Sequence, residues 1–287
     1  MATHQDHPAL FSFELFPPKT DAGIARLRET VRQLNTRQPA YFSVTYGAGG
    51  STQPNTFATV GWLREQGIAA APHLSCIGSS RTDITGILQH YADQAIDRIV
   101  ALRGDLPSGS GAGAIGELAH ANELVALIRE RFGQKFKIEV AAYPEMHPQA
   151  PGFRQDIENF ERKVAAGADS AITQYFYNAD AYAHFVEACD ARGIDIPIVP
   201  GIMPITNFSN LVRFSDACGA EIPRWLRKRL EGFGDDTESI VAFGIDVVSG
   251  LCEQLLAQGA PGLHFYTMNQ AGPTLAIWDN LRLSTPA

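Results

Sequence analysis

Short apolar stretches alternate with longer amphipathic stretches along the whole chain. The apolar stretches are rich in β-branched and aromatic residues and predict eight strands: residues 10–17, 40–46, 70–76, 98–104, 137–144, 170–177, 197–204 and 262–269. The intervening stretches repeat apolar residues at helical spacing and predict helices over residues 21–37, 55–66, 82–95, 117–132, 153–166, 179–192 and 238–258. Strands that alternate with helices in this way are typical of a (β/α)8 barrel, so we expect an α/β fold of the TIM-barrel type.

The length of the chain fits one such barrel. With 287 residues it is close to the roughly 250 of a single barrel, and we expect one domain over residues 1–287 with residues 1–9 as a disordered tail. A further helical pattern at residues 223–231, which includes Trp225, predicts either a solvated flap or a subunit contact. The Ser/Gly-rich segment 108–113 predicts either a flexible part of the active face or a plain surface loop.

Charge and composition narrow the classes of partner and compartment. A net charge of −8 and the lack of a visible basic face argue against nucleic acid as the main partner. The first ten residues lack the basic start and apolar core of a secretory signal, and we find no apolar run long enough to span a bilayer, so we expect a cytoplasmic protein. The four cysteines form no Cys-x-x-Cys pair, which favours reduced, mostly buried thiols.

Glu14 is the unusual residue of the first predicted strand, because it is a carboxylate among apolar and aromatic neighbours. An unpaired ionised carboxylate there would be costly. Glu14 therefore either has a buried partner, such as an arginine in a purely structural pair, or has a raised pKa that lets it deliver a proton near neutral pH.

Alternate side chains of a strand point to opposite faces, so parity predicts which residues share the barrel interior and its mouth. For seven of the eight strands, all but the seventh, we expect these inward sets: Ser12, Glu14 and Phe16; Ser43 and Thr45; His73 and Ser75; Ala101, Arg103 and Asp105; Ala141, Tyr143 and Glu145; Ile172 and Gln174; and His264, Tyr266, Met268 and Gln270. Polar members of these sets gather toward the carboxyl ends of the strands. This is the end at which barrel enzymes carry their active sites.

The missing residues narrow the chemistry further. None of the five lysines lies on an inward strand position, which argues against a Schiff-base aldolase. The first strand has no His-x-His and the histidines form no ligand set, so we expect no metal. Glu14 and Asp105 are the evident carboxylate pair for a glycosidase, but the tryptophans that such a site uses fall in helices. The segment 47–52 predicts either a phosphate cradle or a tight turn.

Eight motifs in register, one for each predicted strand, carry a resemblance to a known family. They are FELFPPK (13–19), SVTYGAGGST (43–52), PHLSC (72–76), LRGD (102–105), AAYPEMHP (141–148), AITQYF (171–176), PGIMP (200–204) and HFYTMN (264–269). Together they closely resemble 5,10-methylenetetrahydrofolate reductases of the short bacterial type, which lack the regulatory domain of the eukaryotic enzymes. The resemblance spans essentially the whole chain and implies a place in one-carbon metabolism and methionine biosynthesis.

The resemblance implies a flavin-dependent barrel. FAD is expected at the carboxyl face of the barrel, where NADH, or else NADPH, reduces it before a folate enters the same place. Glu14 would be the general acid that protonates the folate N10 and opens the ring to a 5-iminium cation, which then accepts hydride. Asp105 would lie near the flavin and stabilise that cation by its negative charge.

The resemblance also assigns the binding residues. Positions matching the FAD site are Thr45, His73, Leu102, Arg103, Gly104, Asp105, His120, Ala141, Tyr143, His147, Asp156, Lys163 and Ile172. Positions matching the substrate site are Glu14, Thr45, Gln174, Phe214, Tyr266, Met268 and Gln270. For Asp156 and Lys163 a solvated helix face is the alternative, and for Phe214 a place in the core.

Two positions depart from the family pattern. Gln270 stands where the family usually has an arginine, and His120 stands where it commonly has a tyrosine. These departures put recognition of the folate tail and of the adenosine end of FAD in doubt. A homo-oligomer is expected, and two other interpretations stay open: a flavin barrel that receives electrons from a second protein, and a flavin-free hydrolase that uses the two carboxylates.

Overall fold

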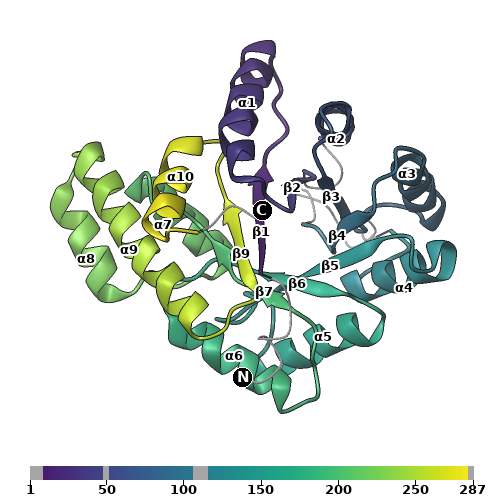
Figure 1. The fold of residues 1–287 in the computed structure, drawn as a ribbon. Coiled ribbons are helices and arrows are strands. Elements are labelled where there is room, and N and C mark those ends of the chain that lie inside the picture. The colour runs from purple at the N-terminus through teal and green to yellow at the C-terminus, as the bar shows by residue number, and fades with distance from the viewer. Residues whose placement is uncertain (1–8, 48–51, 106–115, 284–287) are drawn as a thin grey trace.

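The chain folds into a barrel of parallel strands surrounded by helices (Figure 1). The computed structural model describes residues 9–47, 52–105 and 116–283. The strands are β1 (Leu10–Leu15), β2 (Tyr41–Val44), β3 (Ala70–Ser75), β4 (Arg98–Leu102), β5 (Lys137–Ala142), β6 (Ser170–Thr173), β7 (Ile198–Val199), β8 (Gly201–Ile202) and β9 (Gly262–Tyr266). The predicted (β/α)8 TIM barrel is therefore confirmed.

Ten α-helices and a short 3-10 helix, η1 (Asn35–Arg37), occupy the described part of the chain. The α-helices are α1 (Asp21–Leu34), α2 (Gln53–Glu65), α3 (Arg81–Asp93), α4 (Ala121–Phe132), α5 (Phe153–Ala165), α6 (Ala179–Asp190), α7 (Phe208–Cys218), α8 (Arg224–Phe233), α9 (Thr237–Ala257) and α10 (Ala271–Asn280). Side-chain caps start several of them; Thr20 accepts a hydrogen bond from the Gly23 amide, and Ser80 accepts one from the Asp83 amide. The bounds of α7 and α10 were not predicted.

The seventh predicted strand is divided in the structure. Its first half, β7, pairs with β6, and its second half, β8, pairs with β9. Pro200 lies between the halves and has no amide hydrogen to donate. The strand order runs from β7 through β6, β5, β4, β3, β2, β1 and β9 to β8, so these two halves of one strand position close the barrel.

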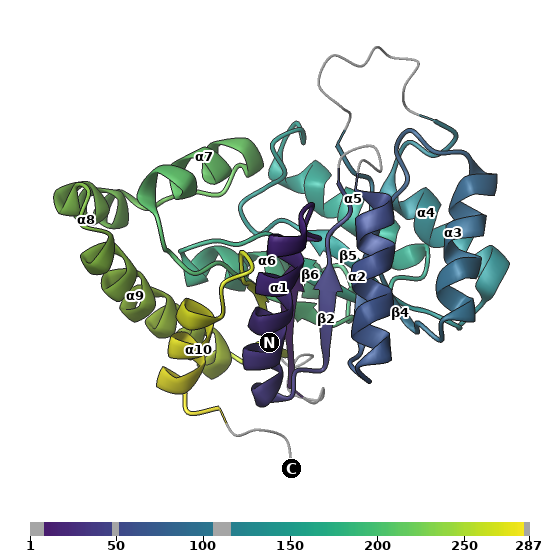
Figure 2. The same ribbon diagram turned by 90° about the horizontal axis from the view of Figure 1, so that it is seen from above.

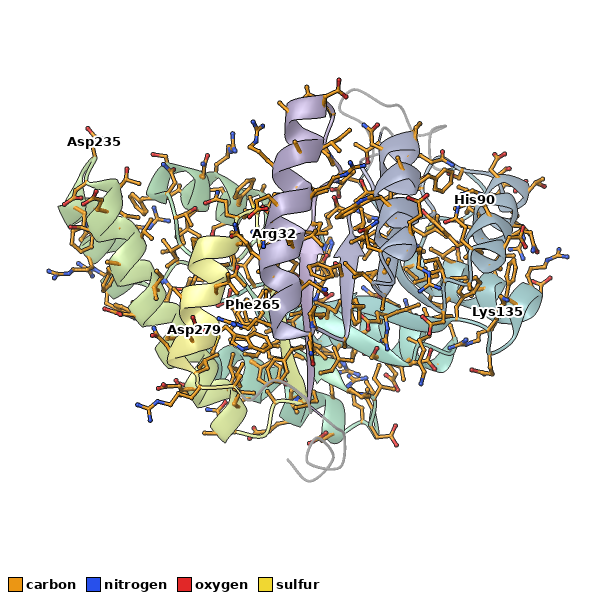
Figure 3. The ribbon with its side chains drawn as sticks, turned by 45° about the horizontal axis from the view of Figure 1, so that its top comes forward. Arg32, His90, Lys135, Asp235, Phe265 and Asp279 are labelled. Carbon is orange, nitrogen blue, oxygen red and sulfur yellow. The ribbon has the colours of Figure 1, made fainter. Side chains whose placement is uncertain are left out.

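Two apolar layers hold the barrel together. The outer layer lies between the strands and the helices and contains the fully buried Phe13, Leu15 and Phe42. Phe265 belongs to the same layer, whereas Lys135 and Asp235 lie at opposite outer edges of the molecule (Figure 3). A smaller inner cluster fills the barrel interior with Tyr41, Ala71, Val100 and Ile172.

The parity expected for the fourth strand was wrong. Ala101 lies in the outer layer, and Val100 lies in the interior instead. The register explains this, because His73 of β3 pairs with Val100, and His73 is an inward residue. Arg103 and Asp105 follow the end of β4, so strand parity no longer governs the direction of their side chains.

Helices α7, α8, α9 and α10 gather on one side of the barrel (Figure 2). Helix α9 has 21 residues and contains an 18-residue stretch with a mean hydropathy of 1.7. It is therefore long and apolar enough to cross a membrane, which corrects the expectation that no apolar run of the chain could do so. It packs against α6, α8 and α10 and buries Val248, Cys252 and Leu255, so length and composition are weak evidence for a membrane span.

The four cysteines are free, and three of them are buried. Burial raises the pKa of the Cys76 thiol to about 11, which keeps it protonated and unreactive near neutral pH. The predicted tail up to residue 8 and the segment 108–113 lie outside the described residues.

Candidate active site

Two adjoining cavities open at the carboxyl ends of the strands. One is polar, with a volume of about 430 Å³, and lies between the ends of β4 and β5 and helices α4 and α5. The other is more apolar, about 540 Å³, and has Glu14 in its wall. They share the residues Asp105, Tyr143, His147 and Gln149. The arrangement offers a long ligand one continuous site with a charged half and an apolar half.

Glu14 has two histidines as its buried partners. Its Oε2 lies 3.4 Å from Nε2 of His73 and 3.8 Å from Nε2 of His264, and its side chain is only 10% exposed. Burial lowers the pKa of His73, while the Glu14 carboxylate opposes this shift. In the described part of the chain, the recorded ion pairs of Glu14 are these two, so the alternative of an arginine partner is wrong.

The backbone around Glu14 is tied to the loop that follows β9. The Thr267 hydroxyl donates to the Glu14 carbonyl oxygen at 2.6 Å. The Asn269 amide group both accepts from the Phe16 amide and donates to the Phe16 carbonyl, each at 2.9 Å. These side chains hold the end of β1 in place, and the carboxyl group of Glu14 is thereby presented to the cavity.

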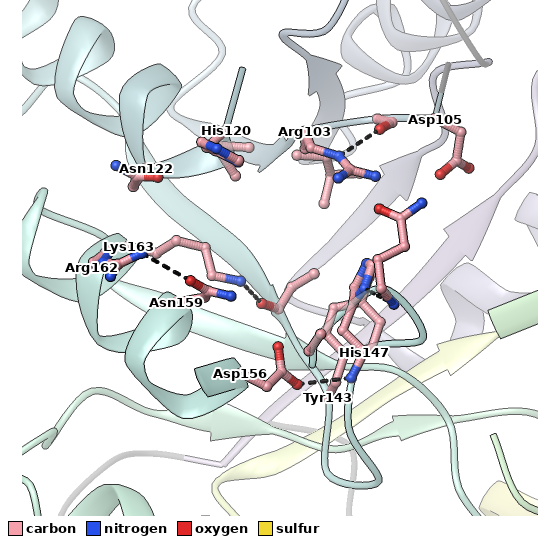
Figure 4. A pocket seen from close by; sticks show the side chains of 17 residues that line it. Arg103, Asp105, His120, Asn122, Tyr143, His147, Asp156, Asn159, Arg162 and Lys163 are labelled. Carbon is pink, nitrogen blue, oxygen red and sulfur yellow. Dashed lines mark hydrogen bonds between the residues drawn. The ribbon is translucent and has the colours of Figure 1, made fainter. Parts of the chain in front are cut away.

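Helix α5 supplies one wall of the polar cavity. Asp156 is buried and accepts a hydrogen bond from the His147 amide at 2.8 Å, and the Lys163 ammonium donates to the Ala141 carbonyl oxygen (Figure 4). Burial lowers the pKa of Lys163 to about 8, and the Asp156 carboxylate opposes this shift. Both side chains line the cavity, so the alternative of a solvated helix face is wrong for them.

His147 presents a hydrogen-bond donor to the cavities. Its Nδ1 accepts from the Gln149 amide at 3.0 Å, which leaves the proton of the neutral ring on Nε2. Burial lowers the pKa of His147, with the Asp156 carboxylate opposing, and the neutral form is favoured. The ring contacts Tyr143 edge to face at a centroid distance of 4.5 Å.

Gly104 allows β4 to end close against β3. Its φ is +83°, and a Cβ there would lie 1.6 Å from the Ser75 hydroxyl oxygen. Ser75 in turn donates to the Arg103 carbonyl at 2.9 Å. Only glycine fits this conformation. The close packing places Arg103 and Asp105 just after the end of β4, in the wall of the polar cavity.

The apolar cavity contains most of the predicted substrate residues. Gln174, Phe214, Tyr266 and Met268 line it together with Glu14. Phe214 on α7 is half-buried; it lines this cavity and also packs against the hydrophobic core, so the two interpretations of this residue both have support. The Tyr266 hydroxyl donates to the Thr173 carbonyl at 2.7 Å across the barrel.

Several predicted residues lie outside both cavities. Thr45 and Ile172 are not among the lining residues, and His73 lies beneath the cavity beside Glu14. Gln270 was expected on an inward strand position, but β9 ends at Tyr266 and Gln270 is the exposed N-cap of α10. Met268 and Asn269 have positive φ angles of 52° and 54°, which ends the alternation on which the expectation rested.

The structure adds lining residues that sequence reasoning missed. In the polar cavity they are Ala121, Asn122, Gln149, Ala150, Asn159 and Arg162. Asn159 lies between Asp156 and Lys163 at helical spacing, so a polar stripe on α5 was a signal that pointed to it. No group of three metal-binding side chains occurs within the described ranges. Of the segment 47–52, the described ends show the Gly47 amide donating to the Thr52 hydroxyl at 2.7 Å.

Comparisons with known proteins identify the family. The family described as methylenetetrahydrofolate reductase matches residues 1–282. The 5,10-methylenetetrahydrofolate reductases of Salmonella typhimurium and Escherichia coli are 39% and 38% identical over 271 residues, which cover 94% of this chain and 90% of each relative. A methylenetetrahydrofolate reductase (NADH) of Arabidopsis thaliana is 38% identical over 95% of this chain and 48% of its own length.

The fold has a counterpart among solved structures. An uncharacterized protein from Clostridium thermocellum, described as binding two copies of 5-methyl-5,6,7,8-tetrahydrofolic acid, superposes with a TM-score of 0.69 over 96% of this chain and 97% of its own. At 16% identity this likeness shows the fold alone. The family match over the whole barrel, together with the relatives that cover it, shows that the chain belongs to the methylenetetrahydrofolate reductase family.

Proposed function

We propose that this oxidoreductase converts 5,10-methylenetetrahydrofolate to 5-methyltetrahydrofolate with FAD as its cofactor and NADH as its electron donor. The observation that carries the proposal is the placement of the buried carboxyl of Glu14 in an apolar cavity that adjoins a polar, cation-lined one. The family match supports the reaction, and the NADH named for the plant relative supports the choice of donor.

The polar cavity fits the diphosphate and sugar parts of FAD. Arg103, Arg162 and Lys163 provide cationic donors, and Nε2 of His147 provides a neutral one. The buried carboxylate of Asp156 is an acceptor suited to hydroxyl groups. FAD bound here would supply hydride to the folate, with its ring system toward the cavity that contains Glu14.

Glu14 is suited to hold the proton that ring opening requires. Its side chain lies in the wall of the more apolar cavity, and burial lowers the pKa of the neighbouring His73, which favours the neutral imidazole. In this role Glu14 delivers its proton to N10 of the folate, while the Gln174 side chain, which both donates and accepts, orients the pterin ring. Phe214 stacks on the ring from α7.

Asp105 has a separate electrostatic role in the proposal. It lines both cavities at their junction, where its negative charge would face a pterin bound beside Glu14. A fixed carboxylate there stabilises the cation that forms on the folate when the ring opens.

Anaerobic half-reactions test the proposal. The purified protein, reconstituted with FAD, is mixed first with NADH or NADPH and then with 5,10-methylenetetrahydrofolate while the flavin absorbance is followed. We expect NADH alone to bleach the flavin and the folate to restore the colour. Failure to bind FAD would contradict FAD as the cofactor. Bleaching that needs a second protein in place of NADH would contradict NADH as the electron donor.

A further inference from the structure

A buried carboxylate lies deep in the barrel, toward the end opposite the cavities. Glu139 of β5 is 1% exposed and contacts the Arg98 guanidinium through one oxygen. Its other oxygen accepts the Tyr41 hydroxyl at 2.6 Å, and the guanidinium lies 4.7 Å from the centre of the Tyr41 ring. The proposed function uses none of these three residues.

Two further residues connect this cluster to Glu14. Burial and the nearby Glu139 raise the pKa of Tyr41, whereas a side-chain hydrogen bond from Ser12 acts in the opposite direction. The Ser12 hydroxyl also lies 2.7 Å from Nδ1 of His264, and Nε2 of that ring lies 3.8 Å from the Glu14 carboxyl. Ser12 is the register partner of both Tyr41 and His264 on the neighbouring strands, so a polar chain runs from Glu139 through Tyr41 and Ser12 to His264, whose Nε2 faces Glu14 across 3.8 Å without a hydrogen bond.

The direction of this chain follows from its anchored end. A carboxylate held by a guanidinium accepts hydrogen bonds and cannot donate, so Tyr41 must donate its only hydroxyl proton to Glu139. The Tyr41 oxygen can then only accept a hydrogen bond, which the Ser12 hydroxyl donates, and the Ser12 oxygen in turn accepts from Nδ1–H of His264. Nε2 of a neutral His264 is consequently an acceptor that faces Glu14.

We propose that Glu139 is a positioning residue: through Tyr41 and Ser12 it holds His264 in the Nδ1–H tautomer, so that the lone pair of Nε2 faces the Glu14 carboxyl, the group that gives its proton to the folate. The inference deepens the proposed function and rests on it for the use of that proton. The opposite direction would place a proton on Nε2, which would stabilise the Glu14 carboxylate instead.

Other groups around Glu14 stay the same in either direction. His73 of β3 lies 3.4 Å away; burial lowers its pKa, the Glu14 and Glu139 carboxylates oppose this shift, and His264 adds to it. Burial and then Glu14 raise the pKa of Tyr266 of β9. The Tyr266 hydroxyl donates to the Thr173 carbonyl. A substitution of Glu139 or Tyr41 therefore acts on Glu14 through His264. Loss of the Glu139 charge would also lower the pKa of His73, because that charge raises it.

Nitrogen NMR of the full-length protein with 15N-labelled histidine tests the tautomer directly. The His264 signals are assigned by their loss in His264→Gln, and we expect a protonated Nδ1 and an unprotonated Nε2 in the wild type. In Glu139→Gln the amide oxygen faces Arg98 and the NH₂ group donates to Tyr41, which reverses every hydrogen bond of the chain. Nε2 of His264 should then carry the proton.

Tyr41→Phe is the second variant, because loss of the buried charge in Glu139→Gln can prevent folding. It removes the link, frees the Ser12 hydroxyl to donate to Nδ1, and should also move the proton toward Nε2. Tyr182→Phe is the matched control, since this buried tyrosine donates to the Ile198 carbonyl at 2.7 Å and has no link to Glu14. A protonated Nε2 in the wild type, or an unchanged His264 in both variants, overturns the proposal.

Kinetics give a second readout that a structural role would not move. In the folate half-reaction the pH above which the step slows should be lower in Glu139→Gln and Tyr41→Phe than in the wild type, with about a tenfold slower step at higher pH for each pH unit of this displacement. Reduction by NADH should be retained, and Tyr182→Phe should match the wild type in both. The NMR measurement needs neither flavin nor folate, so it decides the tautomer even where the proposed function fails.

Discussion

From the lowered pKa of Lys163 we predict that the affinity for FAD depends on pH. Burial holds this pKa at about 8 in the free protein, so the side chain is charged at pH 7 and mostly neutral at pH 9. His147 has a lowered pKa and Tyr143 one raised to about 12, so neither changes charge over this range. A diphosphate beside the ammonium group raises the pKa of Lys163, and binding therefore takes up a proton above pH 8.

The expected size follows from this linkage. The charged fraction of a group with a pKa of 8 falls about tenfold between pH 7 and pH 9, so FAD should bind about tenfold more weakly at pH 9. Below about pH 7 this contribution should be constant. Lys163→Met should abolish the pH dependence and weaken binding at pH 7 by about 10- to 150-fold, the equivalent of a charge-assisted hydrogen bond of roughly 1.5–3 kcal/mol.

Fluorescence titration of the apoprotein with FAD at pH 7, 8 and 9 measures this dependence. Lys135→Met is the matched control, because Lys135 is exposed in the turn between α4 and β5, away from the cavity, and its loss should leave affinity and pH dependence unchanged. A wild-type affinity that is equal at pH 7 and pH 9, or a slope that persists in Lys163→Met, would refute the reasoning.

Three further substitutions test the roles proposed around the cavities. Glu14→Gln should leave reduction of the flavin by NADH intact and slow its oxidation by the folate about 10²–10⁴-fold; equal damage to both half-reactions in stopped flow would contradict an acid role. Asp105→Asn should slow the folate step and raise the flavin reduction potential, and an unchanged potential would place Asp105 away from the ring system. Gln270→Arg should lower the folate KM at most about fivefold, because Gln270 is exposed and an exposed ion pair contributes only about 0–1 kcal/mol; a fall in kcat instead would indicate a different role.

Most of the fold could be predicted because the information is local. The strand with Phe13 and Leu15 on one face and Ser12 and Glu14 on the other shows a period of two, and the structure puts these pairs on the outer and inner sides of β1. The unusual environment of Glu14 was also evident from its neighbours in sequence. The nature of its partners was not, because His73 and His264 lie 59 and 250 residues away.

The amino-acid pattern by itself determined the eight-fold alternation, the end of the barrel that carries polar groups and the candidate residues around it. Only the tertiary structure decided the interior parity of β4, the break of the seventh strand at Pro200 and the exposed position of Gln270. It alone brought Arg98, Tyr41 and Glu139 into one buried cluster. The reason is that periodicity is set within a segment, whereas register and ion pairing depend on hydrogen bonds between strands that are distant in sequence.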